Sequence, residues 1–430
     1  IKYIQYYTYL KKYMKGKLTF ILNRLREQLW FRPVLFCLFS VAGALVAHLS
    51  DNTELYKYVP KIKTESIQEL LSTLSASMLV ISIFAVGSMI SAYNAASNTA
   101  TPRSFKLVVA DDSSQNALSV FIGSFIFSVV ATVAMKNGYY GKSGHFTLFA
   151  LTVGMFTIVI FTFLNWVSKI SSLGRLATTI QKIEDAAAKS IRVIHSNHYL
   201  GSIPYDKQDT TGVPLYIETI GHILQINTSK LQQIAEEKHI YIRLNCLQGN
   251  FITPNKPILY ITTEGGVAVD FEMKVLEEAF TLGPVRLFDE DPRFGFITLS
   301  EIASRALSPA VNDPGTAIAI LESHLRLFAE WIKNESETKA VEPLFSRIKV
   351  PVIHVEDLFE DAFRPIARDG AGNIEVQLRL QKVLQSIYSM GDERCKELAK
   401  KHSILAYKRA EGALPIKEES EMLKSVSILN

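Results

Sequence analysis

Apolar residues are spread unevenly along this chain of 430 residues, and their longest runs all fall between residues 33 and 168. A membrane-spanning helix needs about 20 mostly apolar residues to cross a hydrocarbon core about 30 Å thick. Four stretches approach or exceed this length without a charged residue at their centre: residues 33–49, 67–93, 117–135 and 146–167. The pattern therefore predicts a transmembrane domain of about four helices over residues 33–168.

Basic residues near the ends of these stretches predict the orientation of the chain in the membrane. Residues 1–32 contain eight Lys or Arg against one acid, Glu27, whereas the loop between the first two spans contains three lysines. An excess of Lys and Arg marks cytoplasmic flanks, so we expect the N-terminus in the cytoplasm, and four crossings return residues 169–430 to that side. The basic, aromatic segment 1–32 suits either a helix lying on an anionic leaflet or a flank that only sets topology.

The remaining polar part of the chain predicts a soluble α+β region. Residues 169–212 are typical of a juxtamembrane helix followed by a polar linker. From residue 213 the period changes to two, and Ile240, Ile242 and Leu244 share one face. We expect a small β-barrel or sandwich over residues 213–265 and a helical domain over residues 266–430. The predicted fold class is thus an α-helical membrane protein with a cytoplasmic α+β region and a helical C-terminal part.

The second apolar span is rich in hydroxyl groups. Ser72, Ser75 and Ser82 fall on one helical stripe. If several copies bring this helix together, the stripe could line a hydrated pore. The alternative is close helix packing, the commoner use of small polar residues within membranes.

A second concentration of polar residues lies between residues 286 and 317. One helix is expected to end near Leu307, and the next to begin at Pro314 with Asp313 as its N-cap. Free N–H groups at helix N-termini can hold an anion, although Asn312 and Asp313 can equally satisfy those groups themselves. The candidate ligand-binding or structural residues are Arg286, Asp291, Arg305, Ser308, Asn312, Asp313 and Thr316.

Charge and cysteine content exclude other classes of protein. The formal net charge is only +4, so no strong positive field points to a nucleic-acid partner. Cys37, Cys246 and Cys395 lie far apart, and neither a disulfide framework nor a cysteine zinc site is expected. The sequence contains no Walker loop, nucleophile elbow or His-Glu-x-x-His motif. We therefore expect no enzymatic activity, no metal and no cofactor.

Several short motifs along the chain form a recognisable set. They are residues 101–103 (TPR), 249–254 (GNFITP), 283–286 (GPVR), 291–295 (DPRFG) and 306–317 (ALSPAVNDPGTA). With these motifs the chain resembles DUF2254, a bacterial family of predicted membrane proteins. At Thr101 the family more often has Ser, at Ala310 it usually has Gly, and at Gly315 an aromatic residue; the changes at Ala310 and Gly315 touch no polar group. The resemblance implies a location in the bacterial inner membrane but assigns no chemistry.

Two functions from different classes remain. The first is a homo-oligomeric channel with a pore lined by the second span and a cytoplasmic vestibule, and its expected partners are the lipid bilayer, further copies of the chain and an ion. The second is a membrane-anchored sensing or interaction protein that binds a small anion or a partner through its cytoplasmic helical domain. The hydroxyl stripe favours the first and the polar motif of residues 286–317 favours the second.

Overall fold

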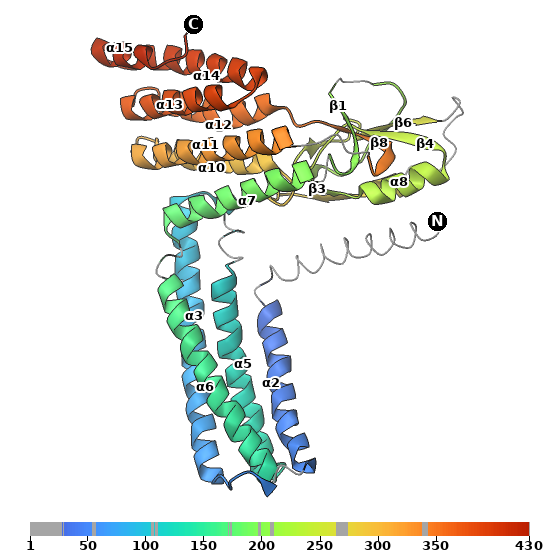
Figure 1. The fold of residues 1–430 in the computed structure, drawn as a ribbon, viewed down its shortest axis with the longest axis vertical. Coiled ribbons are helices and arrows are strands. Elements are labelled where there is room, and N and C mark those ends of the chain that lie inside the picture. Colours follow the sequence, from blue (N-terminus) through green and yellow to red (C-terminus); the bar gives the residue numbers. More distant parts are fainter. Residues whose placement is uncertain are drawn as a thin grey trace. The chain divides into compact units, whose positions relative to one another are not determined.

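The computed structural model describes residues 28, 30–53, 57–104, 107, 111–170, 172, 174–196, 199–206, 210–263, 274–337 and 343–429. The expected interfacial segment 1–32 therefore falls almost entirely outside the described residues. The chain divides into two compact units, Ile1–Thr179 and Ile180–Asn430 (Figure 1). Because the units are contiguous in sequence, the chain passes between them once.

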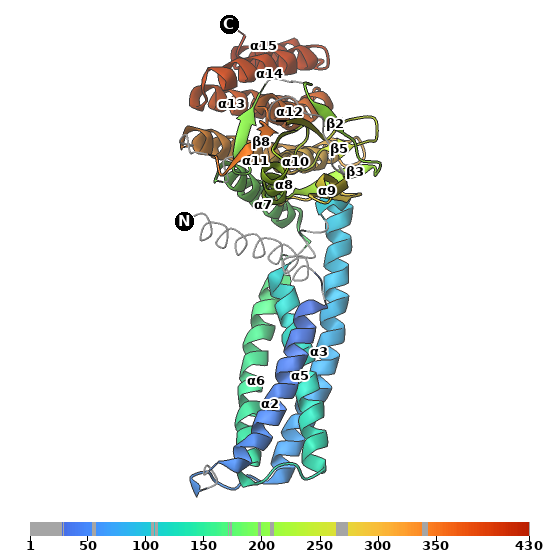
Figure 2. The ribbon, with the colours of Figure 1, turned by 90° about the vertical axis from the view of Figure 1, so that its right-hand side faces the viewer.

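The first unit contains four long apolar helices, each long and apolar enough to cross a membrane (Figure 2). The predicted four spans are confirmed at this level. At about 1.5 Å per residue the 36 residues of α3 extend about 54 Å, well beyond a hydrocarbon core. The helices are α2 (Phe31–Leu49), α3 (Thr64–Thr99), α5 (Asp112–Lys136) and α6 (Lys142–Ile170), with short 3-10 turns at Ser50–Asn52 and Pro102–Ser104.

Helix α5 is the centre of this bundle, with 56% of its apolar span buried against at most 28% in the other three helices. Two of its hydroxyls form hydrogen bonds within the helix. Ser124 Oγ donates to the Val120 carbonyl at 2.7 Å, and Ser128 Oγ donates to the Ser124 carbonyl at 2.8 Å. A Cβ added at Gly123 would lie 3.0 Å from Cβ of Phe36, so α2 approaches closely at this point. Small residues on α5 therefore serve helix packing, as is usual in membranes.

One end of the bundle is fixed by an acid that the sequence pattern did not single out. The carboxylate of Asp51 accepts the backbone N–H groups of Gly141 and Gly144, both at 2.7 Å, at the start of α6. A Cβ at Gly144 would lie 2.4 Å from Asp51 Oδ2. Asp51, in the turn after α2, thus caps the N-terminus of α6. The positive pole of the α6 dipole lies at this N-terminus and favours a carboxylate.

The second unit contains most of its helices in three stacked pairs (Figure 1). Their apolar faces meet in a core of aromatic side chains that includes Phe296, Phe328, Phe359 and Phe363. The pairs are α10 (Pro292–Ala306) with α11 (Pro314–Glu337), α12 (Val355–Asp369) with α13 (Ile374–Met390), and α14 (Glu393–Glu411) with α15 (Lys417–Ser425). Helix α7 (Leu176–Ser196) leads into this unit, and two shorter helices are α8 (Thr228–Glu237) and α9 (Lys274–Glu277).

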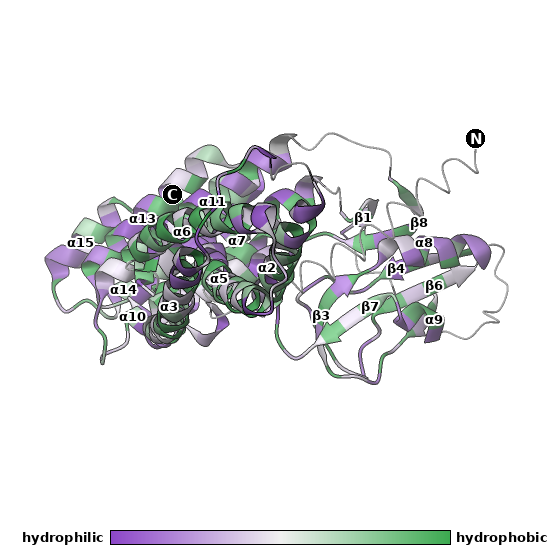
Figure 3. Ribbon diagram, turned by 90° about the horizontal axis from the view of Figure 1, so that it is seen from below, coloured by the Kyte–Doolittle hydropathy of each residue, from purple (hydrophilic) through white to green (hydrophobic). Residues whose placement is uncertain are grey.

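The strands form two open sheets, with strand orders β1-β8-β4-β6-β2 and β5-β3-β7. Helix α8, which contains both hydrophilic and hydrophobic residues (Figure 3), packs against β8 and β4. Both edge strands of the larger sheet contain a proline, Pro204 or Pro214, which lacks the N–H needed to add a further strand. The strands are β1 (Ser202–Tyr205), β2 (Val213–Leu215), β3 (Gly221–Ile226), β4 (Ile240–Leu244), β5 (Phe251–Ile252), β6 (Leu259–Thr263), β7 (Phe280–Gly283) and β8 (Phe345–Pro351).

This arrangement changes the expected β module. Within the described residues the strands close no barrel, so the barrel or sandwich of residues 213–265 is not confirmed. The sheets also take in β1, β7 and β8, which lie outside that range. Strand β8 pairs in parallel with both β1 and β4, so the larger sheet depends on distant parts of the chain.

Candidate functional site

The polar motif of residues 286–317 is divided by helix α10. Arg286 and Asp291 precede this helix, whereas Arg305, Ser308, Asn312, Asp313 and Thr316 lie at or beyond its C-terminal end. The 15 residues of α10 extend about 22 Å at 1.5 Å per residue. The structure therefore brings the predicted residues together in two groups, and one small anion cannot contact both.

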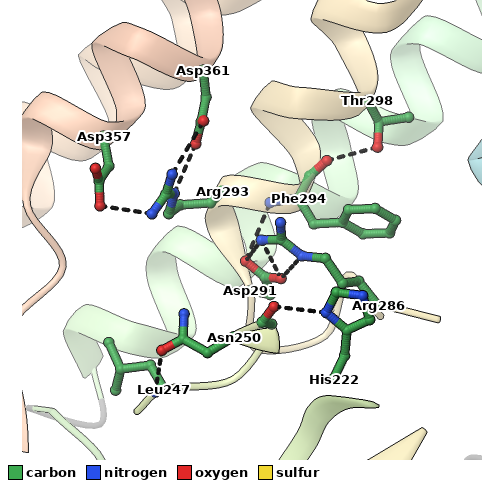
Figure 4. A network of polar contacts seen from close by, with 11 residues as sticks. His222, Leu247, Asn250, Arg286, Asp291, Arg293, Phe294, Thr298, Asp357 and Asp361 are labelled. Carbon is green, nitrogen blue, oxygen red and sulfur yellow. Dashed lines mark hydrogen bonds and ion pairs between the residues drawn. The ribbon is translucent and has the colours of Figure 1, made fainter. Parts of the chain in front are cut away.

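The first group is centred on an ion pair. Arg286 donates through Nε and Nη2 to the two carboxylate oxygens of Asp291, at 2.7 and 2.8 Å, and Asp291 is 4% exposed (Figure 4). Asp291 also caps α10 by accepting the N–H of Phe294 at 3.2 Å. Burial raises the pKa of Asp291, and the guanidinium of Arg286 opposes that rise. Arg286 is thus engaged by a carboxylate of the chain itself, which makes this end of α10 a structural junction.

Gly249 brings the motif of residues 249–254 onto this ion pair. Its φ is +84°, and an added Cβ would lie 1.9 Å from Asp291 Oδ2 and 3.0 Å from Arg286 Nη2. Its carbonyl oxygen lies 3.1 Å from Nδ1 of His222 on β3 (Figure 4). The turn before β5, strand β3 and the start of α10 therefore meet at one point, and only glycine leaves room for the contact.

Arg293 continues the polar network into the next helical pair. It donates to Asp357 at 2.6 Å and to Asp361 at 2.8 and 3.2 Å, so α10 is bound to α12 by two carboxylates (Figure 4). Arg293 belongs to the motif of residues 291–295 but was not among the predicted site residues. A charged residue directly after a helix-starting proline was the available sequence signal, but its partners lie more than sixty residues away.

The second group forms an exposed loop with a fixed backbone. The N–H groups of Val311 and Asn312 both donate to the carbonyl of Ser308, at 3.0 and 2.9 Å. The N–H group of Asp313 donates to the carbonyl of Ala306 at 2.8 Å. Asn312 has a φ of +50°, a conformation that Asn tolerates better than most residues. All residues from Pro309 to Asn312 are exposed, and Val311 is 50% exposed.

Asp313 caps helix α11, as predicted. Its carboxylate accepts the Thr316 N–H at 3.1 Å and the Thr316 hydroxyl at 2.5 Å. Ser308 Oγ donates to the carbonyl of Arg305 at 2.7 Å. A carboxylate of the chain thus occupies the position at the start of α11 where an anion was considered, and anion binding there stays a prediction.

A buried chain of two hydrogen bonds, which the sequence did not predict, lies within the aromatic core. Pro365 has no N–H for the carbonyl of Asp361, and the Ser300 hydroxyl donates to that carbonyl at 2.7 Å instead. Because this hydroxyl has one proton, it must accept from Nε2–H of His324, 3.1 Å away. His324 is fully buried, its Nδ1 contacts no polar partner among the described residues, and burial lowers its pKa to about 3. The proline within α12 was the available sequence signal.

The three serines of the predicted pore stripe occupy different environments in α3. Ser72 is exposed, Ser75 is half-buried, and Ser82 is buried with its hydroxyl donating to the Met78 carbonyl at 2.7 Å. A pore wall built by several copies stays a prediction. Across the described ranges, no group of three or more His, Cys, Asp or Glu side chains is placed to hold a metal ion.

The fold defines a membrane protein with four apolar helices and a second unit of stacked helices and two open sheets. The family of predicted membrane proteins designated DUF2254 matches residues 26–386, and the chain belongs to that family. The resemblance seen in the motifs is thereby confirmed.

Individual relatives are more distant. Over 113 residues the chain is 29% identical to the uncharacterized protein Mb1321c of Mycobacterium bovis and to the uncharacterized protein Rv1290c of Mycobacterium tuberculosis. These matches cover 25% of this chain and only 22% of the length of each relative. No solved structure matches the chain.

Proposed function

We propose that this protein is a membrane-anchored interaction protein that presents residues 308–313, which we name the recognition loop, to a partner protein. The observation that supports the proposal is a loop that is both exposed and held in one conformation by three backbone hydrogen bonds. A loop fixed before binding loses little conformational entropy when a partner docks. Val311 offers apolar contact area, and Arg305 at the end of α10 is exposed beside it in sequence.

Photo-crosslinking from the full-length protein in its host membrane tests this role. A photoreactive amino acid at Val311 is compared with the same residue at Ile416, because these side chains are 50% and 48% exposed. We expect an adduct of defined mass from position 311 and none of that mass from position 416. The adduct should persist in Asn312→Gly, which accepts a positive φ, and disappear in Asn312→Val, which resists it. No adduct at 311, or the same adduct at both positions, would refute the proposal.

The proposal includes the setting of the protein as well. We propose that the chain lies in the bacterial inner membrane with its N-terminus and second unit in the cytoplasm; the basic residues before the first span support this orientation. No catalytic role is assigned, and homo-oligomers are proposed. Labelling of an Ile416→Cys variant by a membrane-impermeant reagent tests the orientation: intact cells should protect this position and permeabilised cells should expose it.

A channel is the second candidate, supported by one feature of α3. Gly87 is exposed, and an added Cβ would meet no atom within 4 Å, so a helix of another copy has room to approach. Ion flux through reconstituted protein tests this function. If Ser72 and Ser75 line a path, Ser72→Leu and Ser75→Leu should reduce flux at least tenfold while Ile83→Leu leaves it unchanged. Absence of flux in the wild type would remove the channel from consideration.

A further inference from the structure

The first helices of the three stacked pairs form one row. Helix α10 contacts α12, and α12 contacts α14. Near the helix starts, Arg293 of α10 binds Asp357 of α12 at 2.6 Å. Glu356 of α12 likewise binds Arg394 of α14 at 2.6 Å. Because the starts of the three helices lie together, the helices run parallel and their C-terminal ends also lie side by side.

The recognition loop lies at the C-terminal end of this row. It begins directly after α10, and a Cβ added at Gly370, the residue after α12, would lie 3.3 Å from Leu307 Cδ1. The side chain of Ser304 in α10 also hydrogen-bonds that of Asp369 in α12. A partner that docks on the recognition loop therefore lies close to the C-terminal half of α12, with α14 as the next helix along.

The C-terminal halves of these three helices present basic side chains to solvent. Residues 400–410 of α14 contain four Lys or Arg and no acid. Lys401 and Lys408 are seven residues apart, about two helical turns, so they share one face of α14. The exposed cations, which we name the basic surface, are Arg305, Arg364, Arg368, Lys401 and Lys408.

The carboxylates that bind these cations are more buried than the cations themselves. Glu360 faces Arg364 at 2.5 Å and Lys401 at 3.9 Å, so one negative charge is shared by two positive ones. The Glu360 side chain is 28% exposed, against 60% for Arg364 and 58% for Lys401. Arg368 binds Asp369 at 2.6 Å, and their side chains are 65% and 24% exposed. The charge that this surface turns outward is therefore positive.

The helix dipole does not account for the two central cations. A dipole favours cations only within the last turn of a helix. Lys401 lies ten residues before the end of α14, and Arg364 lies five residues before the end of α12. Positive charge in the middle of two neighbouring helices complements an anionic partner.

We propose that the partner of the recognition loop carries an acidic segment that lies across α10, α12 and α14 on the basic surface. This inference rests on the proposed function and names the chemistry of the partner. Packed helices lie about 8–10 Å apart. An extended polyproline II segment advances about 9 Å in three residues. Acidic residues at every third position of such a segment can therefore meet one helix each.

The uncharged positions of the surface favour a polypeptide over a nucleic acid. Leu405 is 38% exposed and lies between Lys401 and Lys408 on the outward face of α14, where it offers apolar contact. The side chains of this face are Arg394, Glu397, Lys401, Leu405 and Lys408, and none has a ring on which a base can stack.

Binding of a defined peptide to the full-length protein in nanodiscs of zwitterionic lipid tests the proposal. The probe is a fluorescent peptide of about 12 residues with Glu at every third position, which matches the helix spacing. Anisotropy should show saturable binding that weakens at least tenfold when Arg364→Gln, Arg368→Gln and Lys401→Gln are combined. No saturable binding to the wild type would overturn the proposal.

The matched control removes the same charge from the second helices of the pairs. The combined substitutions Arg379→Gln, Lys382→Gln and Lys424→Gln change exposed cations of α13 and α15 and should alter binding less than twofold. Equal losses in both triple variants would mean that the peptide responds only to net charge and would overturn the proposal.

Charge reversal guards against a variant that fails to fold. The combination of Arg364→Glu, Arg368→Glu and Lys401→Glu should lose the glutamate peptide and bind the same peptide with Lys in place of Glu, a gain that misfolding cannot supply. Failure to bind the lysine peptide, or tighter binding of the wild type to a single-stranded oligonucleotide of equal charge than to the glutamate peptide, would count against an acidic polypeptide.

The photo-crosslink at Val311 separates this inference from the proposed function. The adduct should fall at least fivefold in the Arg364, Arg368 and Lys401 triple Gln variant and persist in the control triple variant. An adduct that ignores the three cations would leave the recognition loop as a docking site and overturn the acidic segment. No adduct even in the wild type would instead refute the proposed function, and this inference with it.

Discussion

At the scale of single residues, the polar groups of the second unit depend on a few positions where one added or removed side-chain atom would break a contact. Gly249 is such a position, since its backbone lies directly on the Arg286–Asp291 pair. Ser300 is another, because its hydroxyl hydrogen-bonds both to the Asp361 carbonyl, which Pro365 cannot bond, and to Nε2 of His324. An unsatisfied buried polar group costs about 1–3 kcal/mol, so a substitution at either position should lower the free energy of unfolding measurably.

We predict that Gly249→Ala lowers the free energy of unfolding by more than about 2 kcal/mol. The methyl group would overlap Asp291 Oδ2, and alanine resists a φ of +84°. Denaturant unfolding of the full-length protein, followed by fluorescence, measures the change. Gly315→Ala is the matched control, because its Cβ would lie 3.4 Å from Asp313 Oδ1 and should cost less than about 0.5 kcal/mol. Equal effects at both glycines would contradict the interpretation of this junction.

At the scale of secondary structure, four helix starts in the second unit are set by capping side chains, whereas α12 and α15 begin without one. Asp291, Asp313, Asn373 and Asp392 each accept the N–H three residues further along the chain. These caps satisfy donors that the helix itself leaves free, and they are visible in the sequence as a short acceptor residue before an apolar run. The recognition loop differs only in that it joins one helix end and the next start within a few residues.

We predict that Asp313→Ala costs about 1–2 kcal/mol of unfolding free energy, because the Thr316 N–H and hydroxyl both lose their acceptor. Asp313→Asn keeps an acceptor oxygen at the same place and should cost less than half as much. Thermal unfolding with near-ultraviolet circular dichroism compares the two. A loss in Asp313→Asn as large as in Asp313→Ala would mean that the negative charge, and not the cap, is required.

At the scale of the whole molecule, the second unit combines a sheet region and stacked helices through buried polar and aromatic contacts. Two histidines lie in the aromatic core: burial lowers the pKa of His324 to about 3 and that of His402 to about 4, against an ordinary value of 6.5. Below pH 6.5 the unfolded chain binds protons at these positions while the folded chain does not. Stability therefore falls as the pH is lowered from 6.5 toward 4.

We predict a loss of about 1.4 kcal/mol per pH unit for each of these histidines between about pH 6 and pH 4.5. Denaturant unfolding at several pH values measures the slope. His324→Gln should remove about one proton's contribution from the slope, because the buried imidazole of His324 is then absent. A slope that is unchanged in His324→Gln would show that His324 is not the neutral, buried group described here.

Local patterns in the sequence determined the parts of this protein that depend on neighbouring residues. The four apolar spans, the helix start at Pro314 with its Asp313 cap, and the buried face of Ile240, Ile242 and Leu244 all follow from hydrophobicity, capping and period. The family followed from short motifs in the same way. These features are encoded within one helix, one strand or one turn, and sequence reasoning needs no further information to find them.

Only the tertiary structure decided which distant residues meet. Strands β1, β7 and β8 pair with distant strands to form the open sheets. The polar motif of residues 286–317 is divided into two groups at the ends of α10, and Arg293 binds carboxylates of α12. The contacts of Gly249 with Asp291 and of Gly295 with Ala187 likewise join separate elements. Gly249 and Gly295 belong to short motifs, but the motifs do not reveal these contacts, because the space available to a Cβ is set by whichever backbone or side chain packs against it in three dimensions.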